Sequence, residues 1–367
     1  MVRITRMSSD QKDYWNREIA KFDMVHPLNA FGWGAVRSVD KWKPIYVVAE
    51  NDGVVCGMMM VLVKNIPYTP YSIMYSPKGP VWNYDDRKTL EALVAEANRI
   101  GAEHNAIFLR IDPNIKEDDI ADGDDPFEEL GFIHLQQRWT FWNSPRDVYR
   151  IDLTKYDSAD KLFNMFDRDT RRCIRKAAKE GVTIEPATEV AQLERFYEIF
   201  SEHSMARGFL IRGLEYQKKL WDEYVKENNG RLFLAKYKGD MIGGLICIQF
   251  ARKHLAMHMG TPYRYQKLQS NYAYLWESIK WAKETGCVWY SFRGVGTTQS
   301  QEYFKSKFLP EVVRLIGYYD LPLKPSLYKM FNFSEFTVLP KAWPYLISLR
   351  EKFHKKNKTN PMSEKPA

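Results

Sequence analysis

Five positively charged residues gather at helical spacing near the middle of the chain. They are Arg171, Arg172, Arg175, Lys176 and Lys179. Residues three or four apart share a helix face, and a face that meets only water usually mixes charge signs to form ion pairs. Unmixed cations repel one another, and a phosphate backbone would neutralise them. An ordinary solvated face is the alternative, but we favour contact with RNA, without readout of its sequence.

These cations need a helix to align them. Ser158 is suited to cap its N-terminus and Gly181 to end it. Between them lies an apolar stripe at helical spacing, formed by Leu162, Phe166, Cys173, Ile174 and Ala177. The pattern predicts one long helix over Ser158–Gly181.

On either side of this helix the chain repeats one unit. Tyr46–Val63 and Leu232–Phe250 each hold two apolar runs joined by a charged turn with a glycine, which is typical of a β-hairpin. Each hairpin is followed by a strand, a helix that we expect to end at Gly101 or Gly286, and another strand. The repeated order resembles the GNAT-like (N-acyltransferase) fold, in which a splayed mixed sheet admits an acyl donor.

We therefore predict an α+β fold of two tandem GNAT-like domains with a substrate cleft between them. The first domain covers residues 1–148, ending just after a turn at Asn143–Pro145, and the second covers residues 149–319. Residues 320–367 are expected to return to the first domain and complete it.

Composition sets the broad class of the protein. The 367 residues suit two domains, and a hydrophobic content of 45% excludes a disordered chain. A net charge of +8 favours polyanionic partners. The four cysteines include no C-x-x-C pair, so neither a zinc site nor a disulfide framework is indicated, and a reduced cytosolic setting fits. The N-terminus has no apolar signal core, and no apolar stretch approaches the roughly 18 residues of a membrane span.

Several motifs, taken in order, are similar to one protein family. They are FGWGAVRSVDKW, SPKGPVW, LRIDP, RRCIRKAAKEGV, LFLAKYKG, WESIKWAKETG, FRG, EYFKSKF and IGYYD. Together they resemble the FemABX family of peptidoglycan-precursor aminoacyltransferases, especially its small FemX-type members, over Asn29–Tyr319. The long coiled-coil arm of the larger relatives is missing, because Tyr216–Gly230 runs straight into the strand at Leu232.

The resemblance implies an enzyme that takes glycine, alanine or serine from an aminoacyl-tRNA. The acceptor would be the stem peptide of UDP-MurNAc-pentapeptide or lipid II, and the product would be part of the interpeptide bridge. The aminoacyl-tRNA is a co-substrate, and no metal or organic cofactor is implied. Such an enzyme is cytoplasmic. Its tail from Trp343 to Lys358 mixes aromatic and basic residues, which would suit peripheral contact with the inner membrane leaflet, although a plain C-terminal helix packed on the first domain is the alternative.

The same resemblance implies the residues that bind the precursor. Arg37 and Arg212 match cations that hold the nucleotide diphosphate, with Tyr216 one turn beyond Arg212. Two cations from different domains can grip a diphosphate across a cleft, and ordinary surface arginines are the alternative. His258, also assigned to the substrate site, stands where an aromatic residue such as tyrosine is expected, as does Ile107, so contacts with a base or sugar would differ here.

Two further residues match the reaction centre of the family. Lys305 matches a lysine whose ammonium would stabilise the oxyanion that forms when an amine attacks the aminoacyl ester. Asp112 matches a carboxylate that would orient the amine or take its proton. The alternatives are that Lys305, like Lys307, is an ordinary lysine on a short helix, and that Asp112 only shapes the turn before Pro113.

Two other functions stay open. A CoA-dependent N-acyltransferase usually carries a glycine-rich turn whose amides cradle the pyrophosphate, and the loops SPKGPVWNYDDRKT and GTPYRYQKLQSNYA do not supply that pattern. A non-enzymatic RNA-binding protein on the same fold would explain the basic helix, but not Lys305 together with Arg37 and Arg212.

Overall fold

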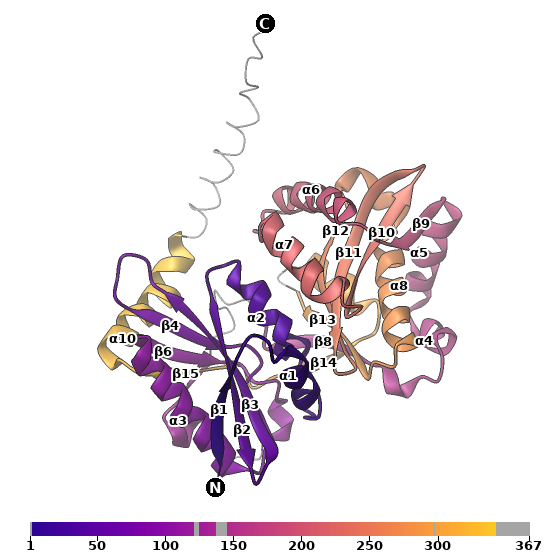
Figure 1. Ribbon diagram of the computed structural model, residues 1–367. Helices are drawn as coiled ribbons and strands as arrows, with labels where there is room; N and C mark the ends of the chain where they lie inside the picture. The colour runs from indigo at the N-terminus through magenta and orange to yellow at the C-terminus, as the bar shows by residue number, and fades with distance from the viewer. Residues whose placement is uncertain (1, 121–124, 137–144, 297, 343–367) are drawn as a thin grey trace, which may run out of the picture.

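Two mixed β-sheets flanked by helices make up the computed structural model, which describes residues 2–120, 125–136, 145–296 and 298–342 (Figure 1). The predicted α+β class with two tandem sheets is confirmed. Part of the predicted turn at Asn143–Pro145 and the predicted tail at Trp343–Lys358 lie outside the described residues.

The first sheet has the strand order β1-β2-β3-β4-β6-β15-β7, and β5 pairs with β3. Its strands are β1 (Arg3–Met7), β2 (Lys43–Asn51), β3 (Val54–Asn65), β4 (Ser72–Ser76), β5 (Val81–Trp82), β6 (Ala106–Ile111), β7 (Ile133–Leu135) and β15 (Tyr318–Pro322). One face is covered by α3 (Arg87–Glu103), and α1 (Lys12–Ile19) and α2 (Phe31–Ser38) lie on the other. Helix α10 (Pro325–Phe333) packs against β6.

The second sheet has the order β14-β8-β13-β12-β11-β10-β9. Its strands are β8 (Asp147–Asp152), β9 (Val182–Pro186), β10 (Gly230–Tyr237), β11 (Asp240–Phe250), β12 (Lys253–Gly260), β13 (Trp289–Gly294) and β14 (Glu311–Arg314). One face carries α4 (Ala159–Met165), α5 (Arg168–Lys179) and α8 (Ser270–Glu284), and the other carries α6 (Val190–Arg207) and α7 (Leu214–Leu220). Helix α9 (Gln299–Ser306) precedes β14. The two predicted hairpins are confirmed as β2–β3 and β10–β11.

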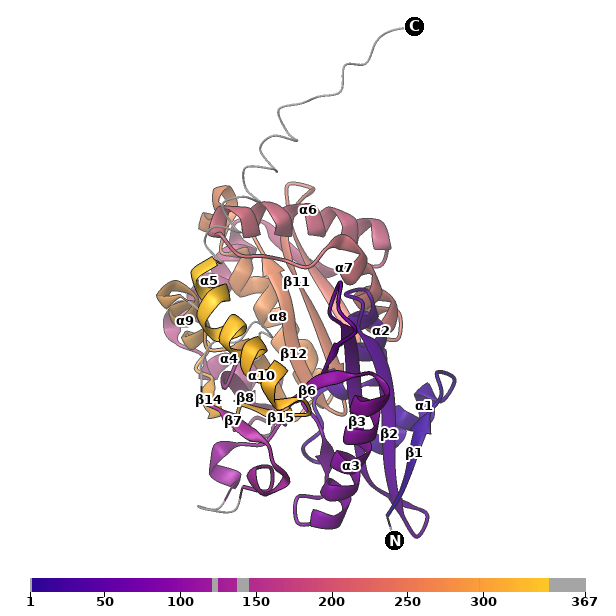
Figure 2. The ribbon, with the colours of Figure 1, turned by 90° about the vertical axis from the view of Figure 1, so that its left-hand side faces the viewer.

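One apolar core joins the two sheets. Successive side chains of a strand point to opposite faces, so Val47 of β2 packs under α3 while Val48 enters a different cluster. That second cluster also contains Leu232 of β10 and Ile246 of β11. Helices α2 and α7 meet between the sheets (Figure 2). The relative position of the two domains is therefore set by apolar burial.

Close packing of α2 on β2 fixes the end of that helix. A Cβ atom at Gly34 would lie 2.2 Å from the hydroxyl oxygen of Tyr46, so only glycine permits this approach. The Tyr46 hydroxyl in turn donates a hydrogen bond of 2.7 Å to the carbonyl oxygen of Phe31. Arg37, in the last turn of α2, is held at the edge of the interdomain region as a result.

The predicted helix over Ser158–Gly181 is wrong in one respect, because the structure divides it into α4 and α5. Asp167 interrupts it and caps α5 by accepting a hydrogen bond of 2.7 Å from the backbone N–H of Asp169. Ser158 caps α4 in the same way, as expected.

The predicted end of the first repeated helix at Gly101 is also wrong. Helix α3 continues to Glu103, and Gly101 lies inside it. A Cβ atom at position 101 would meet Leu323 at 2.3 Å, so this glycine allows the segment after β15 to pack on the helix. Gly286, by contrast, follows the end of α8 with a φ of 74°.

Within the described ranges, none of the helices combines the length and the apolar character that crossing a membrane requires. The same residues hold no group of three or more histidine, cysteine or acidic side chains that could bind a metal ion.

A buried ion triad ties β15 and the following helix to the first sheet. The guanidinium of Arg110 on β6 donates two hydrogen bonds of 2.7 Å to Asp320 and one of 2.8 Å to Glu335. All three side chains are almost completely buried. Burial of two carboxylates is tolerable only while a cation pairs with them.

We expect Arg110→Met to lower the free energy of unfolding by about 3–5 kcal/mol, because it leaves two buried carboxylates without their cation. Urea denaturation at pH 7 measures this change. Arg195→Met, which removes an exposed pair with Glu198 on α6, is the matched control and should cost less than about 1 kcal/mol. Equal losses in the two variants would contradict the assignment.

Candidate active site

Two arginines from different domains meet at one carboxylate between the sheets. Nη1 of Arg37, from α2, lies 3.6 Å from Oδ2 of Asp40. Arg212, from the segment between α6 and α7, donates a hydrogen bond to the same oxygen. The guanidinium of Arg37 also lies 5.6 Å from the ring centre of Trp42. The structure thus brings together the two cations that the sequence predicted, which we call the arginine pair.

The arginine pair carries more positive charge than Asp40 can balance. Burial lowers the pKa of Arg37, and repulsion by Arg212 lowers it further. Nε of Arg37 is buried and has no hydrogen-bond acceptor among the described residues. Lys64 of β3 lies nearby, and burial lowers its pKa as well, with repulsion from Arg37 and Arg212 adding to the effect. An anion placed here would relieve this repulsion.

Tyr216 and His258 extend the site on the side of the second domain. Tyr216 is buried, and its ring centre lies 5.4 Å from the guanidinium of Arg212 and 6.2 Å from the ring of His258. Nδ1 of His258 lies 3.1 Å from Oε1 of Gln217. Burial, together with Arg293 and Arg212, lowers the pKa of His258 to about 3. His258 is therefore a neutral flat ring where an aromatic residue was expected, whereas Ile107, the other such position, is buried on β6 beside α10.

Asp112 is already engaged by its neighbours. Its Oδ1 accepts hydrogen bonds from the Tyr75 hydroxyl at 2.9 Å and the Lys78 backbone N–H at 2.8 Å. Its Oδ2 lies 2.9 Å from Nζ of Lys78, and the carboxylate is only 2% exposed. An incoming amine could reach Asp112 only if Lys78 moved away, so its predicted role near the acceptor amine stays a prediction.

Lys305 lies on α9, half-buried, with its ammonium turned towards β13. Its Nζ donates hydrogen bonds to the carbonyl oxygens of Phe292 at 3.1 Å and Gly294 at 2.6 Å. Burial lowers the pKa of Lys305 to about 8, and repulsion by Arg293 contributes to the shift. The predicted lysine therefore sits in an electrostatic environment that differs from that of an ordinary surface lysine.

Arg293 is the site residue that sequence reasoning missed. It lies between the two carbonyls held by Lys305, and its charge acts on Tyr216, Tyr318 and Arg212. The motif FRG contains Arg293. Nothing in that motif indicates that the backbone of Arg293 has a positive φ, which is 64° in the structure. Only the three-dimensional arrangement shows that it links the arginine pair to α9.

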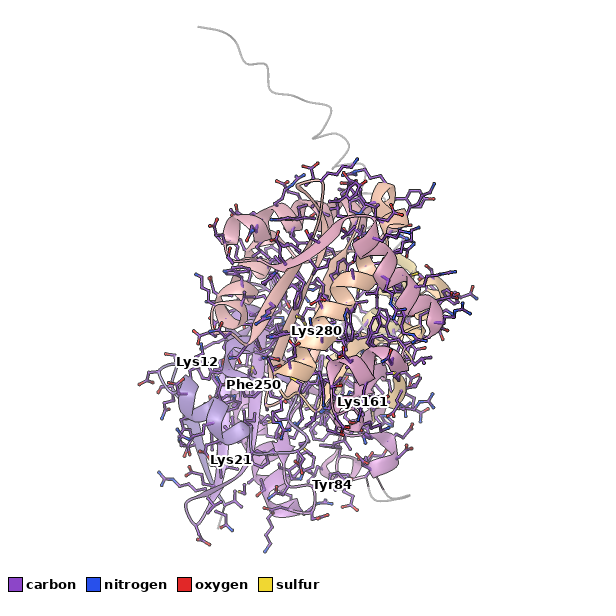
Figure 3. All side chains as sticks on the ribbon, turned by 90° about the vertical axis from the view of Figure 1, so that its right-hand side faces the viewer. Lys12, Lys21, Tyr84, Lys161, Phe250 and Lys280 are labelled. Atoms are coloured by element: carbon purple, nitrogen blue, oxygen red, sulfur yellow. The ribbon has the colours of Figure 1, made fainter. Side chains whose placement is uncertain are left out.

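The basic face predicted at residues 171–179 is present on α5, on the outer side of α8. Of its five cations, Arg171 is half-buried and the others are exposed. Arg172 pairs with Asp169 at 3.1 Å, and the guanidinium of Arg175 lies 5.2 Å from the ring centre of Phe163. Figure 3 views the molecule from the side of α8, where Lys280 is labelled.

The start of α5 contacts the helix that carries Lys305. The Thr170 hydroxyl donates a hydrogen bond of 2.7 Å to the carbonyl oxygen of Lys307, and Nζ of Lys307 lies 3.6 Å from Asp167. The start of α5 and the end of α9 are therefore held together by direct contacts.

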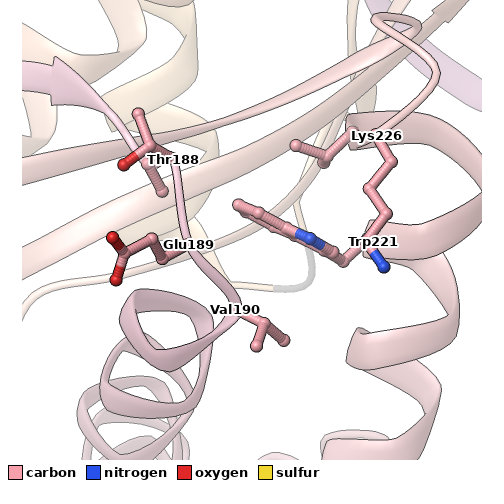
Figure 4. A pocket seen from close by; sticks show the side chains of 7 residues that line it. Thr188, Glu189, Val190, Trp221 and Lys226 are labelled. Carbon is pink, nitrogen blue, oxygen red and sulfur yellow. The ribbon is translucent and has the colours of Figure 1, made fainter.

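Two surface pockets lie outside the arginine pair and α9. One, of about 470 Å³, opens beside Trp221 and Lys226 at the start of α6 and shares no residue with the site (Figure 4). The other, of about 450 Å³, is lined in part by Lys41, Lys43 and Lys64. Because Lys64 also faces the arginine pair, positive charge continues from the pair into this second pocket.

Comparison with known proteins identifies a family match over most of the chain. Residues 16–241 and 231–335 match the FemAB family. Proteins named lipid II:glycine glycyltransferase from Staphylococcus aureus are 28% identical over 228 residues, which cover 60% of this chain and 53% of theirs. The chain thus spans about half the length of the curated relatives it matches.

Solved structures support the fold. The crystal structure of FemX superposes with a TM-score of 0.80 at 20% identity, covering 89% of this chain and 99% of FemX. A tandem GNAT protein from the clavulanic acid biosynthesis pathway superposes with a TM-score of 0.55 at 11% identity, covering 88% of this chain and 99% of its own. These likenesses confirm the predicted tandem GNAT-like architecture.

We expect the stability to fall as the pH drops from 7 to 5. Burial keeps His258 and His254 neutral in the folded protein, with a pKa of about 3, whereas the unfolded chain binds protons below its ordinary pKa of about 6.5. Each histidine then lowers the free energy of unfolding by up to about 2 kcal/mol at pH 5. His258→Phe should reduce the pH-dependent loss by up to that amount in urea denaturation at pH 7, 6 and 5, and an unchanged pH dependence would contradict this.

Proposed function

The chain belongs to the FemAB family, and on this premise we propose that it transfers an amino acid from an aminoacyl-tRNA to the stem peptide of a peptidoglycan precursor. Curated relatives that match part of the chain are named lipid II:glycine glycyltransferase. Glycine is therefore the first amino acid to test, before alanine and serine. An enzyme that uses aminoacyl-tRNA and a precursor of this kind would work in the cytoplasm or at the inner face of the membrane.

The arginine pair is the observation that carries the proposal. Arg37 and Arg212 come from different domains, share the single carboxylate of Asp40, and stand beside Lys64. A diphosphate offers several oxygens to two guanidinium groups and would neutralise the excess positive charge. Both UDP-linked and lipid-linked precursors contain this diphosphate, so the pair suits either form.

The exposed face of α5 supplies a site for the donor. Its cations can contact the phosphate backbone of a tRNA, which would be held without readout of sequence. Since Thr170 of α5 contacts Lys307 directly after α9, a tRNA lying on this face would lie next to the helix that carries Lys305.

Transfer would need little beyond alignment of the two substrates. The aminoacyl ester is already activated, so holding the acceptor amine against its carbonyl carbon provides much of the rate increase. The cations of the site would stabilise the negative charge that develops on the carbonyl oxygen. No cofactor is required for this chemistry, and Asp112 would orient the amine if Lys78 released it.

A mass measurement tests the proposed function. The protein would be incubated with charged total tRNA and UDP-MurNAc-pentapeptide or a lipid-linked precursor, with acetyl-CoA in a parallel reaction. We expect the precursor to gain the mass of one amino acid residue, and ribonuclease to abolish the gain. Acetylation in the parallel reaction, or no gain with either precursor, would instead favour the CoA-dependent or the RNA-binding alternative.

We expect Arg37→Gln and Arg212→Gln each to weaken precursor binding by about 10-fold or more, because each removes a charge-assisted contact with the diphosphate. Isothermal titration calorimetry with UDP-MurNAc-pentapeptide measures the change. Arg195→Gln, at an exposed pair on α6, is the control. Unchanged affinity in both variants of the arginine pair would exclude it as the diphosphate site.

We expect the triple variant Arg172→Gln, Arg175→Gln and Lys176→Gln to weaken tRNA binding and to reduce its salt dependence. Each lost phosphate contact lowers the slope of log affinity against log salt by about 0.7–0.9. A control variant with the same charge loss elsewhere replaces the exposed Arg17, Lys21 and Lys226 by glutamine. If both variants changed the slope equally, the effect would come from net charge and not from α5.

A further inference from the structure

Helix α10 exposes an apolar stripe on the outside of the first domain. Its inner face packs on β6 through Tyr328, whereas Met330 and Phe333 on its outer face are 68% and 64% exposed. Val338, at the end of the π-helical turn η7 (Ser334–Val338), is 47% exposed. Residues three apart share a helix face, and a π-helical turn places residue i+5 one turn beyond residue i. The three side chains therefore follow one stripe along α10, which lies in the foreground of Figure 2.

The charged side chains beside this stripe are positive. Lys329 and Lys341, at either end of it, are exposed. From Leu321 to Ala342 the sequence has one acidic residue, Glu335, and its side chain is buried in the ion triad with Arg110. An apolar stripe flanked by cations is typical of a helix that lies on an anionic membrane surface.

The loop between β3 and β4 lies beside α10. Its residues Ile66 and Tyr71 join the same apolar cluster as Tyr328 of the helix. At the tip of the loop, Tyr68 is fully exposed and has a φ of 63°. A tyrosine ring has an apolar body and a polar end, which suits the interface between water and lipid. The loop thus adds a second exposed aromatic side chain next to the helix.

A basic pocket adjoins this loop. Asn65 and Pro67 line the pocket of about 450 Å³ together with Lys41, Lys43 and Lys64, and none of its lining residues is acidic. The charge of Lys64 also acts together with the arginine pair. Positive charge therefore extends from the loop beside α10 towards the proposed diphosphate site.

We propose that the outer face of α10 and the tip of the β3–β4 loop form a docking surface for an anionic phospholipid bilayer. The apolar stripe of Met330, Phe333 and Val338 enters the boundary between headgroups and acyl chains. Lys329 and Lys341 contact the lipid phosphates. Docking does not depend on aminoacyl transfer, and only its use in reaching a lipid-linked precursor rests on the proposed function.

The shape and the charge of this surface favour a bilayer over a folded protein partner. The two pockets described above contain no residue of α10, so the stripe is presented on a helix and not in a groove. A bilayer needs no shape to match, because it offers a plane of negative phosphates above apolar chains. The arrangement of lysines around an apolar centre complements both layers.

Vesicle flotation with the full-length protein tests the docking surface. We expect vesicles of phosphatidylglycerol and phosphatidylcholine in equal parts to bind the wild type at least about 10-fold more tightly than vesicles of phosphatidylcholine alone, because each lysine near an anionic surface contributes about fivefold. Raising the salt concentration should weaken this preference by screening. Equal affinity for the two kinds of vesicle, or no binding to either, would overturn the proposal.

A double variant tests the apolar stripe. Met330→Ser with Phe333→Ser should weaken binding to the anionic vesicles by about 10-fold or more, because it removes apolar area that enters the lipid. Val54→Ser with Tyr263→Ser removes two exposed apolar side chains from other parts of the surface and should bind as the wild type does. Equal losses in the two double variants would contradict a specific role of α10.

A second double variant tests the lysines. Lys329→Gln with Lys341→Gln should weaken binding to the anionic vesicles by about 20-fold and leave binding to phosphatidylcholine nearly unchanged. Lys21→Gln with Lys226→Gln, at two other exposed lysines, is the control for net charge. Binding that survives both double variants of α10 would place the lipid contact elsewhere on the chain and overturn the proposal.

Transfer assays separate the docking surface from the proposed function. Met330→Ser with Phe333→Ser should keep the wild-type kcat/KM with UDP-MurNAc-pentapeptide and lose about 10-fold with a lipid-linked precursor in anionic vesicles. A wild type that binds these vesicles but transfers no amino acid to either precursor would refute the proposed function and leave the docking surface standing. Analytical ultracentrifugation without lipid covers the remaining occupant, because a dimer that this double variant dissociates would assign the face to a second copy of the chain and overturn the proposal.

Discussion

The apolar core shared by the two sheets is the constraint on which the site depends. Because the side chains of β2 and β3 alternate, one face of this hairpin packs under α3 and the other packs against the second domain. Burial of this kind is non-directional but large, and it leaves little freedom for one sheet to rotate against the other. Arg37 and Arg212 can share Asp40 only because their domains are held in this way.

On this frame the protein concentrates positive charge, and the described residues balance part of it, as Asp112 does for Lys78. Lys78, Arg150, Lys253 and Arg293 all lower the pKa of His26, which burial already places well below its ordinary value. Arg150, one of these cations, contacts neutral side chains: it donates a hydrogen bond of 2.6 Å to Asn114, and its guanidinium lies over the ring of Trp289. Buried cations with few carboxylates weaken folding, and functional sites commonly accept such a cost. An anionic substrate would complete the charge balance.

The sequence predicted the parts of the fold that depend on local patterns. Both hairpins could be predicted because apolar runs flank a turn that contains glycine, and Ser158 could be predicted as a helix cap. The break between the two helices at Asp167 was not predicted because the apolar stripe continues across it. Gly101 was wrongly predicted to end its helix, because its contact with Leu323 involves a segment far away in the sequence. The resemblance to a family pointed to Arg37, Arg212 and Lys305, but no pattern could place Arg293. The position of Arg293 depends on an irregularity in the pairing of β13 with β8 and on hydrogen bonds from Lys305 to the neighbouring carbonyls, both of which are tertiary features.

The position of β15 has a consequence for synthesis of the chain on the ribosome. This strand pairs with β6 on one side and β7 on the other, so the sheet of the first domain stays open until β15 arrives. His134 of β7 and Ile316, which contact each other, are 182 residues apart. At about 5–20 residues per second, that interval lasts roughly 10–40 s. During this time β6 has an unpaired edge and Arg110 has neither Asp320 nor Glu335, while the whole second domain is made. The first sheet therefore cannot be completed before the second domain has been made, and until then the nascent chain exposes the edge of β6, a kind of edge that can pair with other chains.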